Sequence, residues 1–334
     1  MKGKLPLIQF TDRGIYCPVG DFYIDPVRKV RRAVITHAHA DHAKSGHGAY
    51  LCHSVSEPVL KLRLGKKIHV QSLDYGREIS MNGVKVSLYP AGHIPGSAQV
   101  RIEHGGEVWV VAGDYKTGDD GLSTPYEYLR CHVFVTESTF GLPIFKWQPQ
   151  EDVFEGMLRW SLQCYQQDKI PVLLAYSLGK AQRLLYYLHG KIDNIYVHPA
   201  IEAVNQALRQ AGIPIPKCRH IPGKLKQSDF KSSLIIIPPG ASSELTLNYP
   251  NHFARGVASG WAAARKSFRR YNGASRGFVI SDHADWDGLN LAVNNTGAGK
   301  IIVSHGFTRV FTRWLRERGM NAEALNGSLE FMNG

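Results

Sequence analysis

Short apolar runs recur along the chain, and each is soon followed by a residue that can bind a metal ion or transfer a proton. Runs of this length that are rich in β-branched residues predict buried strands. The six runs are 33–35 before His37, 84–89 before His93, 108–112 before Asp114, 133–135 before Glu137, 277–280 before His283 and 301–303 before His305. In α/β sheets, ligands collect outside the carboxyl ends of the strands, so these side chains are expected to converge. The pattern therefore predicts an α/β fold with one polar site at the strand ends.

The pattern changes between residues 146 and 276, where helix-spaced apolar stripes alternate with strand-like runs. A helix is predicted over 152–165, with an apolar face of Val153, Met157, Trp160 and Leu162. The other predicted elements of this segment are a strand at 171–175, a helix that buries Ala181, Leu184, Leu185 and Leu188, a helix at 201–210 and a strand at 234–237. Because the candidate ligands lie on both sides of the segment, residues 146–276 are predicted to form a domain inserted into another that comprises 1–145 and 277–334.

Composition adds an expectation about the partner. The chain has 334 residues, 43% of them apolar, and a net charge of +12, which favours an anionic partner such as nucleic acid. Its five cysteines are scattered, and a reduced cytoplasmic setting is the simpler interpretation. No apolar run reaches the roughly 18 residues of a membrane helix, and none near residue 1 resembles an ordinary secretory signal. We therefore expect a cytoplasmic protein without a membrane partner.

The densest cluster of candidate ligands is the segment from Thr36 to His42, which holds three histidines and an aspartate. Alternate residues of extended chain present His37 and His39 to the same side, so one zinc ion can take that pair. Asp41 and His42 then remain for a second metal close by, since one turn cannot direct four ligands to a single tetrahedral ion without strain. The alternative is a His-rich surface loop whose spacing arose by chance.

Other residues have weaker local signals. Asp25 could accept a hydrogen bond from a metal-binding histidine, or simply form a turn before a proline. Ser177 and Lys180 lie near a predicted helix start that suits a phosphate, although an ordinary capping serine and an exposed lysine fit as well. Arg265 and Arg269 belong to a basic, aromatic stretch over 261–271 that suits a nucleic-acid groove, although a solvated helix face explains the charges too.

Together these motifs resemble a known family. The cluster His37, His39, Asp41 and His42, with His93 and Asp114 downstream and Asp25 upstream, is similar to the metallo-β-lactamase signature. Glu137, His283 and His305 resemble the three added motifs of the β-CASP nucleases. Residues 136–149 are most similar to bacterial ligase-associated DNA exonucleases, which are Artemis-like members of that branch. The resemblance implies a metallo-β-lactamase αββα sandwich with an inserted β-CASP α/β domain.

The resemblance also implies a ligand set for two zinc ions, with manganese or iron as other metals that the same donors accept. One ion would be held by His37, His39 and His93, and the other by Asp41, His42 and His305. Asp114 would bridge the two, and Asp25 would support them from outside. Asp41, Glu137 and His283 are the residues expected to act in catalysis.

The function expected from the resemblance is a metal-dependent DNA nuclease, an exonuclease of DNA repair. Two ions roughly 3.5–4 Å apart would activate a shared water to attack the phosphodiester. His283, oriented and kept cationic by Glu137, would protonate the leaving sugar oxygen. The ligase-associated resemblance also allows a functional association with a DNA ligase.

Three alternatives stay open at this point. An RNA-processing β-CASP ribonuclease is favoured by His305, which RNA-acting members share. A small-molecule zinc hydrolase is disfavoured by the large insert together with Glu137 and His283. A metal-free binding module is disfavoured because every expected ligand is present in the sequence.

Overall fold

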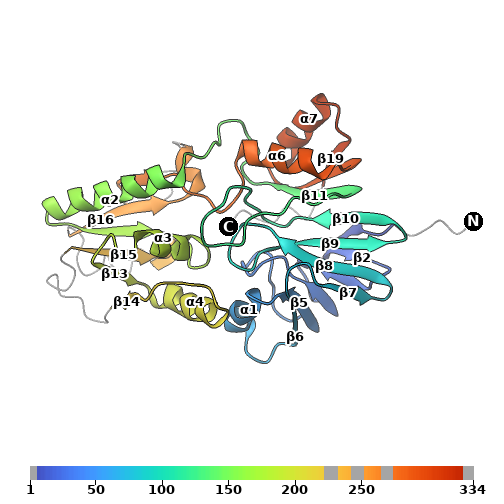
Figure 1. Cartoon of the computed structure of the whole chain (residues 1–334), viewed down its shortest axis with the longest axis horizontal. Helices are drawn as coiled ribbons and strands as arrows, with labels where there is room; N and C mark the ends of the chain where they lie inside the picture. Colours follow the sequence, from blue (N-terminus) through green and yellow to red (C-terminus); the bar gives the residue numbers. More distant parts are fainter. Residues whose placement is uncertain (1–5, 222–231, 242–251, 265–273, 326–334) are drawn as a thin grey trace, which may run out of the picture. The chain divides into compact units, whose positions relative to one another are not determined.

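The computed structural model describes residues 6–221, 232–241, 252–264 and 274–325. The chain divides into two compact units, and the second is inserted into the first. The first unit comprises residues 1–145 and 283–334, and the second comprises residues 146–282. Each unit is described by itself below (Figure 1).

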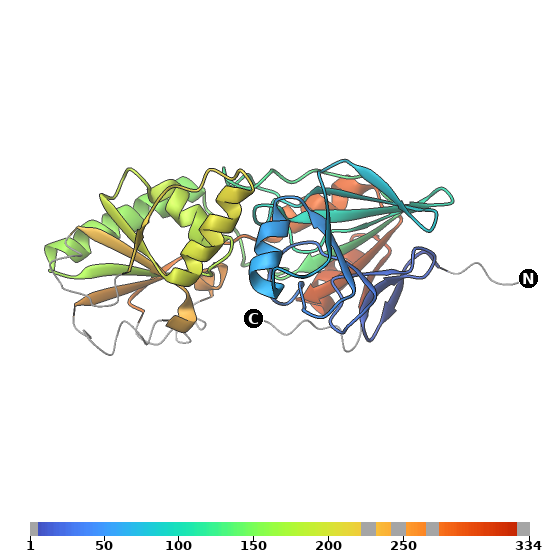
Figure 2. The same cartoon turned by 90° about the horizontal axis from the view of Figure 1, so that it is seen from below.

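The first unit contains two sheets. Among the described residues, the first sheet has six strands in chain order: β1 Gln9–Thr11, β2 Gly14–Cys17, β3 Phe22–Ile24, β4 Arg32–Val34, β5 Ala49–His53 and β6 Val70–Leu73. The second sheet has the order β19-β18-β11-β10-β9-β8-β7, and its strands are β7 Glu78–Met81, β8 Val84–Pro90, β9 Ala98–His104, β10 Glu107–Val111, β11 Val133–Ser138, β18 Lys300–Gly306 and β19 Ala322–Ala324. In both views the blue strands of the first sheet lie beside the teal and green strands of the second (Figures 1 and 2).

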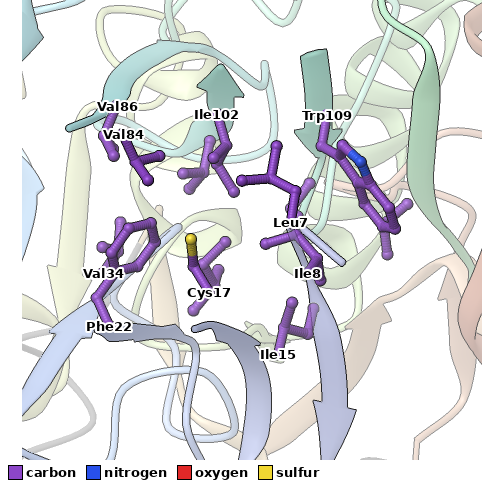
Figure 3. Packing of buried hydrophobic residues seen from close by; sticks show 14 of the residues in the cluster. Leu7, Ile8, Ile15, Cys17, Phe22, Val34, Val84, Val86, Ile102 and Trp109 are labelled. Carbon is purple, nitrogen blue, oxygen red and sulfur yellow. The ribbon is translucent and has the colours of Figure 1, made fainter. Parts of the chain in front are cut away.

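The two sheets share a hydrophobic core. Figure 3 shows Cys17, Phe22 and Val34 of the first sheet pointing toward Val86 and Ile102 of the second. All five side chains are fully buried. Because apolar surface removed from water is the main favourable contribution to folding, this layer fixes how the two sheets face each other.

Helices cover the other face of the second sheet. Successive residues of a strand point to opposite faces, so Val135 joins the core between the sheets whereas Phe134 joins a second core. That second core includes Leu289 of α6 (Trp286–Thr296) and Leu315 of α7 (Thr308–Glu317). The short helix α1 (Ser56–Leu64) packs on β5 of the first sheet. Figure 1 shows α6 and α7 on one side of β11.

The strand directions decide where polar side chains gather. β8 and β10 are both antiparallel to β9, and β11 is parallel to both of its neighbours, β10 and β18. The carboxyl ends of β8, β10, β11 and β18 therefore lie at one edge of the second sheet, and each is followed by or contains a predicted ligand or catalytic residue.

The second unit is built on a parallel sheet. Among the described residues its order is β14-β13-β15-β12-β16-β17, and every pairing is parallel. The strands are β12 Ile170–Leu174, β13 Asn194–Val197, β14 Arg219–His220, β15 Ser233–Ile237, β16 Phe253–Ala258 and β17 Arg276–Phe278. Its helices in the part of the chain that the structure describes are α2 Gln150–Gln166, α3 Lys180–Leu188 and α4 Pro199–Gln210, with the 3₁₀ turns η2 Pro239–Ala241 and η3 Gly260–Ala263. Parallel strands linked by helices are the arrangement that an alternating α/β pattern predicts.

Most sequence-based elements are confirmed, and the mixed α/β class is confirmed with them. Two details were wrong. The run at 277–280 was assigned to the outer domain, but β17 pairs with β16 in the sheet of the second unit. Leu162 was placed on the apolar face of the helix, but its side chain is 59% exposed. It is two residues past Trp160, which at 100° per residue turns it to the opposite side.

In the part of the chain that the structure describes, no helix is long and apolar enough to cross a membrane.

A buried histidine makes the stability of the first unit depend on pH. His53 ends β5, its ring stacks on Tyr75 at 3.6 Å between centroids, and its Nδ1 accepts a hydrogen bond from the backbone of Val55 at 3.3 Å. Burial lowers the pKa of His53 to about 4, so the unfolded chain takes up a proton near pH 6.5 that the folded chain excludes. The free energy of unfolding should therefore fall as the pH drops from about 6.5 to 4.

His53→Gln removes the titrating ring, so its melting temperature should fall less steeply than that of the wild type over this pH range. The measurement is thermal unfolding of both proteins after chelation of metal. His69→Gln alters an exposed histidine and should follow the wild-type slope. Parallel slopes for His53→Gln and the wild type would contradict the assignment.

Candidate metal centre

The His-rich turn follows strand β4 in the first unit. His37 and His42 are buried, whereas His39 and Asp41 are half-buried. The donors of this turn are therefore held by the protein on one side and remain accessible to solvent on the other. Such a site can admit a substrate.

Three imidazole nitrogens converge as a first donor group. His39 Nδ1 lies 3.1 Å from His37 Nε2 and 3.1 Å from His93 Nε2. A tetrahedral zinc ion with bonds of about 2.0–2.1 Å needs neighbouring nitrogens roughly 3.4 Å apart, so this spacing is close to that of a metal site.

A second donor group lies next to the first. His42 Nε2 is 3.7 Å from Asp41 Oδ2 and 3.4 Å from Asp114 Oδ2, and His305 Nε2 is 2.8 Å from Asp114 Oδ1. His305 Nδ1 lies 3.0 Å from the Ser304 hydroxyl, which itself donates to a backbone carbonyl. The hydroxyl oxygen therefore accepts the Nδ1 proton, and Nε2 is the ring nitrogen that faces Asp114.

Asp114 faces both groups. Its Oδ2 is 3.6 Å from His37 Nε2 and 3.8 Å from His93 Nε2, in addition to its contacts with the second group. Imidazole nitrogen and carboxylate oxygen are suitable ligands for zinc, and also for manganese or iron. The residues present thus fit two neighbouring divalent cations with Asp114 between them.

A hydrogen-bonded chain orients two of the histidines. The Asp25 carboxylate accepts from the Thr36 backbone at 2.8 Å, from the Thr36 hydroxyl at 2.5 Å and from His42 Nδ1 at 2.7 Å. Because the Thr36 hydroxyl donates to Asp25, its oxygen accepts from His37 Nδ1 at 3.1 Å. Nδ1 of both rings is then held by the protein, so Nε2 is the nitrogen that faces the site and binds a metal once it carries no proton.

Two glycines permit the loops to come this close. Gly92, just before His93, has φ +70°, and a Cβ there would clash with the Lys116 carbonyl oxygen. Gly113, just before Asp114, has φ +59°, and a Cβ there would lie 2.8 Å from the Thr36 side chain. A larger residue at either position would displace the ligand that follows it.

Glu137 and His283 form a separate pair beside the donor groups. His283 Nδ1 lies 3.0 Å and 3.1 Å from the two carboxylate oxygens of Glu137, and 4.0 Å from Asp114 Oδ2. Glu137 is fully buried and also accepts from the Tyr115 backbone at 2.7 Å. A buried carboxylate of this kind orients the imidazole and stabilises its cationic form.

Comparison with known proteins supplies relatives but no family model, since none matches the chain. A protein named probable DNA ligase from Opitutus terrae is 30% identical over 93% of this chain. The DNA cross-link repair protein SNM1 of Arabidopsis thaliana is 31% identical over 53%, and RNase aCSPSF2 of Saccharolobus solfataricus is 28% identical over 48%. These relatives are metallo-β-lactamase/β-CASP proteins. The chain belongs to the metallo-β-lactamase/β-CASP family.

This family member spans only 30%, 37% and 38% of the lengths of those three relatives. A crystal structure of a protein of unknown function from Enterococcus faecalis has a TM-score of 0.60 and covers 89% of this chain, while this chain covers 79% of that one. At 12% identity, that likeness concerns the fold alone.

Burial and neighbouring charges shift the pKa values of the donor residues. Burial lowers the pKa of His37 well below its usual value, which keeps the ring neutral and ready to bind metal. Burial alone would do the same to His42, but the carboxylates of Asp114 and Asp25 hold the pKa of His42 well above its usual value. Burial alone would raise the pKa of Asp114, but the surrounding imidazoles, that of His42 first, hold it well below its usual range. A cation binding here must displace the proton on His42.

The residues predicted to bind substrate are not part of this cluster. Ser177 and Lys180 belong to the second unit, where Lys180 is buried and pairs with Asp282. Its ammonium is therefore not the exposed group that the sequence suggested. Arg265 and Arg269 lie outside the described residues.

Sequence reasoning missed several residues that support the donor cluster of the first unit. Thr36 and Ser304 orient ligand histidines, and the Arg63 guanidinium of α1 donates to the Ala38 carbonyl inside the His-rich turn. Thr36 and Ser304 each directly precede a ligand, which is a signal that could have been used. Nothing in the sequence links Arg63 to that turn.

Asp25→Asn should weaken metal affinity by about 10–100-fold, because the neutral amide loses the charge that holds His42 Nδ1–H and the Thr36 hydroxyl. Competition titration with a chromophoric chelator would measure the change. Asp12→Asn removes an exposed carboxylate that pairs with Arg28 and should leave the affinity unaltered. Equal affinities in Asp25→Asn and the wild type would show that Asp25 does not support the ligands.

Proposed function

We propose that this chain is a metal-dependent nuclease that hydrolyses phosphodiester bonds, with DNA as the substrate and exonucleolytic DNA repair as its role. The observation that carries the proposal is a metal-type donor cluster beside a separate imidazole–carboxylate pair, all within one unit. Metal ions held by the donor cluster would activate water to attack phosphorus, and the imidazole–carboxylate pair would provide a proton for the leaving group.

The ligand set proposed for two zinc ions is His37, His39 and His93 for one, Asp41, His42 and His305 for the other, and Asp114 between them. Bound divalent cations would supply Lewis-acid stabilisation of phosphate charge and a water made nucleophilic at neutral pH. The chain itself contributes hydrogen bonds that hold Nδ1 of His42 and His305, so that Nε2 of each ring faces the site. It also leaves the site partly exposed at His39 and Asp41.

His283 is proposed as the general acid. Glu137 accepts the Nδ1 proton of the ring, so the proton on Nε2 of the cationic ring is the one available for the leaving sugar oxygen. Glu137 in turn is held by the backbone N–H of Tyr115, which keeps the ring in one orientation. A positioned acid of this kind contributes about 10²–10⁴-fold to the rate.

The family arrangement gives the two units their proposed identities. The two facing sheets with helices outside them correspond to a metallo-β-lactamase αββα sandwich, and the parallel sheet unit corresponds to the β-CASP domain. The proposed domains are 1–145 with 283–334 and 146–282, the bounds of the two compact units.

The preference for DNA rests on the relatives. The protein named DNA ligase aligns over 93% of this chain, and the DNA repair protein over 53%. Relatives named for RNA cleavage align over 48% or, for the endoribonuclease YSH1 of Yarrowia lipolytica, 36%. The relative named probable DNA ligase also supports a functional association of this chain with a DNA ligase.

The second candidate is an RNA-processing ribonuclease built on the same site. His305 favours it, because the resemblance places a histidine at this motif in RNA-acting members, and the names of two relatives agree with it.

One experiment separates the two candidates. Purified, metal-loaded protein is given matched end-labelled DNA and RNA strands, single and double, and the product ladders are read. Cleavage of DNA from an end supports the proposal, and cleavage of RNA alone would overturn the choice of substrate. Absence of cleavage on all four would overturn the assignment as a nuclease.

Binding of DNA should weaken steeply with salt. The excess of basic residues, 40 against 28 acidic ones, implies contacts with phosphates that release counterions. The logarithm of the association constant should fall with a slope of about −0.9 per phosphate contacted in duplex DNA, measured by fluorescence anisotropy between 50 and 200 mM salt, roughly the range over which this effect is large. A flat response would exclude phosphate contacts as the source of affinity.

A further inference from the structure

Three charged side chains meet inside the second unit, where the chain is about to leave it. Lys180 Nζ donates to Asp282 Oδ2 at 2.7 Å, and an Arg183 nitrogen lies 3.8 Å from Asp282 Oδ1. Arg183 also donates to the Ser281 carbonyl at 2.8 Å. The side chains of Lys180, Arg183 and Asp282 are 8%, 4% and 2% exposed, so the cluster is enclosed. Two residues of the departing chain are thus held by one turn of α3.

Helix α3 is itself fixed to its neighbours. Arg183 donates through two nitrogens to Gln150 Oε1 of α2, at 2.6 Å and 3.1 Å, and the Gln150 amide donates to Tyr187 Oη at 2.5 Å. Gln182 donates to Asn205 of α4 at 2.8 Å. The cations that hold Ser281 and Asp282 therefore belong to a rigid framework within the second unit.

A buried cluster of two cations around one carboxylate is a poor source of stability. Removing charges from water costs about as much free energy as their attraction returns, and apolar side chains of the same size would stabilise the unit as well or better. The cluster does fix the position of Asp282, because charge-assisted contacts with Lys180 and Arg183 keep good geometry only over a narrow range of positions of its carboxylate. The free-energy cost of burying these three charges is therefore better explained by the positioning of Asp282 than by a gain in stability.

His283 follows Asp282 directly in the chain, and consecutive Cα atoms are about 3.8 Å apart. We propose that Lys180 and Arg183 are positioning residues, which hold Ser281 and Asp282 so that the His283 ring stays on Glu137. This inference rests on the proposed role of His283 as the general acid. A displacement of about 1 Å at a reacting group can cost about 10²-fold in rate, so release of Asp282 should be visible in turnover.

The test compares two substrates. An ordinary DNA strand has a sugar alkoxide as leaving group and needs an acid, whereas bis(p-nitrophenyl) phosphate releases a stable phenolate and does not. Lys180→Met should lower turnover on DNA by about 10–100-fold with metal content unchanged. Turnover on the nitrophenyl ester should stay within about twofold of the wild type, because that reaction does not depend on the acid. Lys180→Arg keeps a cation at this position, so its turnover on DNA should be much closer to that of the wild type than the turnover of Lys180→Met.

Asp282→Asn provides a second route if Lys180→Met does not fold, since the amide keeps the shape and loses the charge. It should show the same selective loss on DNA. Arg209→Met is the matched control, because it breaks another ion pair of the second unit, at 2.7 Å to Glu202, and should affect the two substrates equally. Circular dichroism and thermal unfolding would verify that each variant is folded at the assay temperature.

The outcomes are distinct. Folded Lys180→Met or Asp282→Asn with wild-type turnover on DNA, or with equal losses on both substrates, would overturn the positioning role. If His283→Ala itself loses activity equally on both substrates, the proposed acid is wrong, and the positioning role is overturned with it. A selective loss in His283→Ala without one in the other variants would overturn the positioning role alone.

Discussion

Asp114→Ala is expected to lose bound metal and to lower turnover on DNA by at least about 10³-fold. Among the described residues, Asp114 is the carboxylate that faces both donor groups: its Oδ2 lies 3.6 Å from His37 Nε2 of the first, and its Oδ1 lies 2.8 Å from His305 Nε2 of the second. Without it, two cations would approach each other with no anion between them. The stabilisation that metals give a phosphoryl transition state amounts to several kcal/mol, which corresponds to about 10³-fold or more in rate.

Metal content by elemental analysis and single-turnover cleavage of an end-labelled strand measure the two effects. Asp120→Asn is a matched control, because Asp120 is also a buried carboxylate of the same loop but accepts from the Leu122 and Ser123 backbones. Its metal content and turnover should equal those of the wild type. Full metal content in Asp114→Ala would show that the carboxylate does not bridge the ions.

His283→Ala is expected to lower turnover on DNA by about 10²–10⁴-fold while the metal content stays at the wild-type level. The ring binds Glu137 through Nδ1 and contributes to none of the three-histidine contacts of the first donor group. Its loss should therefore remove a proton donor and leave the ligands in place. On bis(p-nitrophenyl) phosphate the same variant should be nearly as active as the wild type.

Glu137→Gln tests the same assignment from the other partner. The amide cannot stabilise a cationic ring, so a similar but smaller selective loss on DNA is expected. Simultaneous loss of metal in His283→Ala would show that this histidine is a ligand and not an acid. In that case the Asp114, Glu137 and His283 cluster would have to be regarded as a metal group.

The sequence could predict the strand ends because the physical signal is local. Apolar runs before His37, His93 and Asp114 correspond to β4, β8 and β10, and side chains after parallel strands meet at one edge. Glu137 and His305 were expected after their strands, yet they lie in the last residues of β11 and β18, which are longer than the apolar runs. Pairing between these two strands extends them, and such pairing is a tertiary effect that a local pattern does not contain.

Partners that are distant in sequence could not be predicted. The phosphate role suggested for Lys180 considered only its own helix start, whereas the structure places Asp282 at its ammonium. Likewise, the hydrogen bond from Arg63 to the Ala38 carbonyl joins a helix to a turn that the sequence treats as unrelated. Buried charges depend on their partners, and those partners are set by the fold as a whole.

β18 follows the inserted unit in the chain, and this order has a consequence for synthesis on the ribosome. β18 lies between β11 and β19, and it carries His305, so a nascent chain that ends before residue 300 lacks both a sheet strand and a proposed ligand. The inserted unit, in contrast, is already complete at residue 282. On the proposed function, hydrolytic competence would thus be acquired only after the inserted unit has been completed.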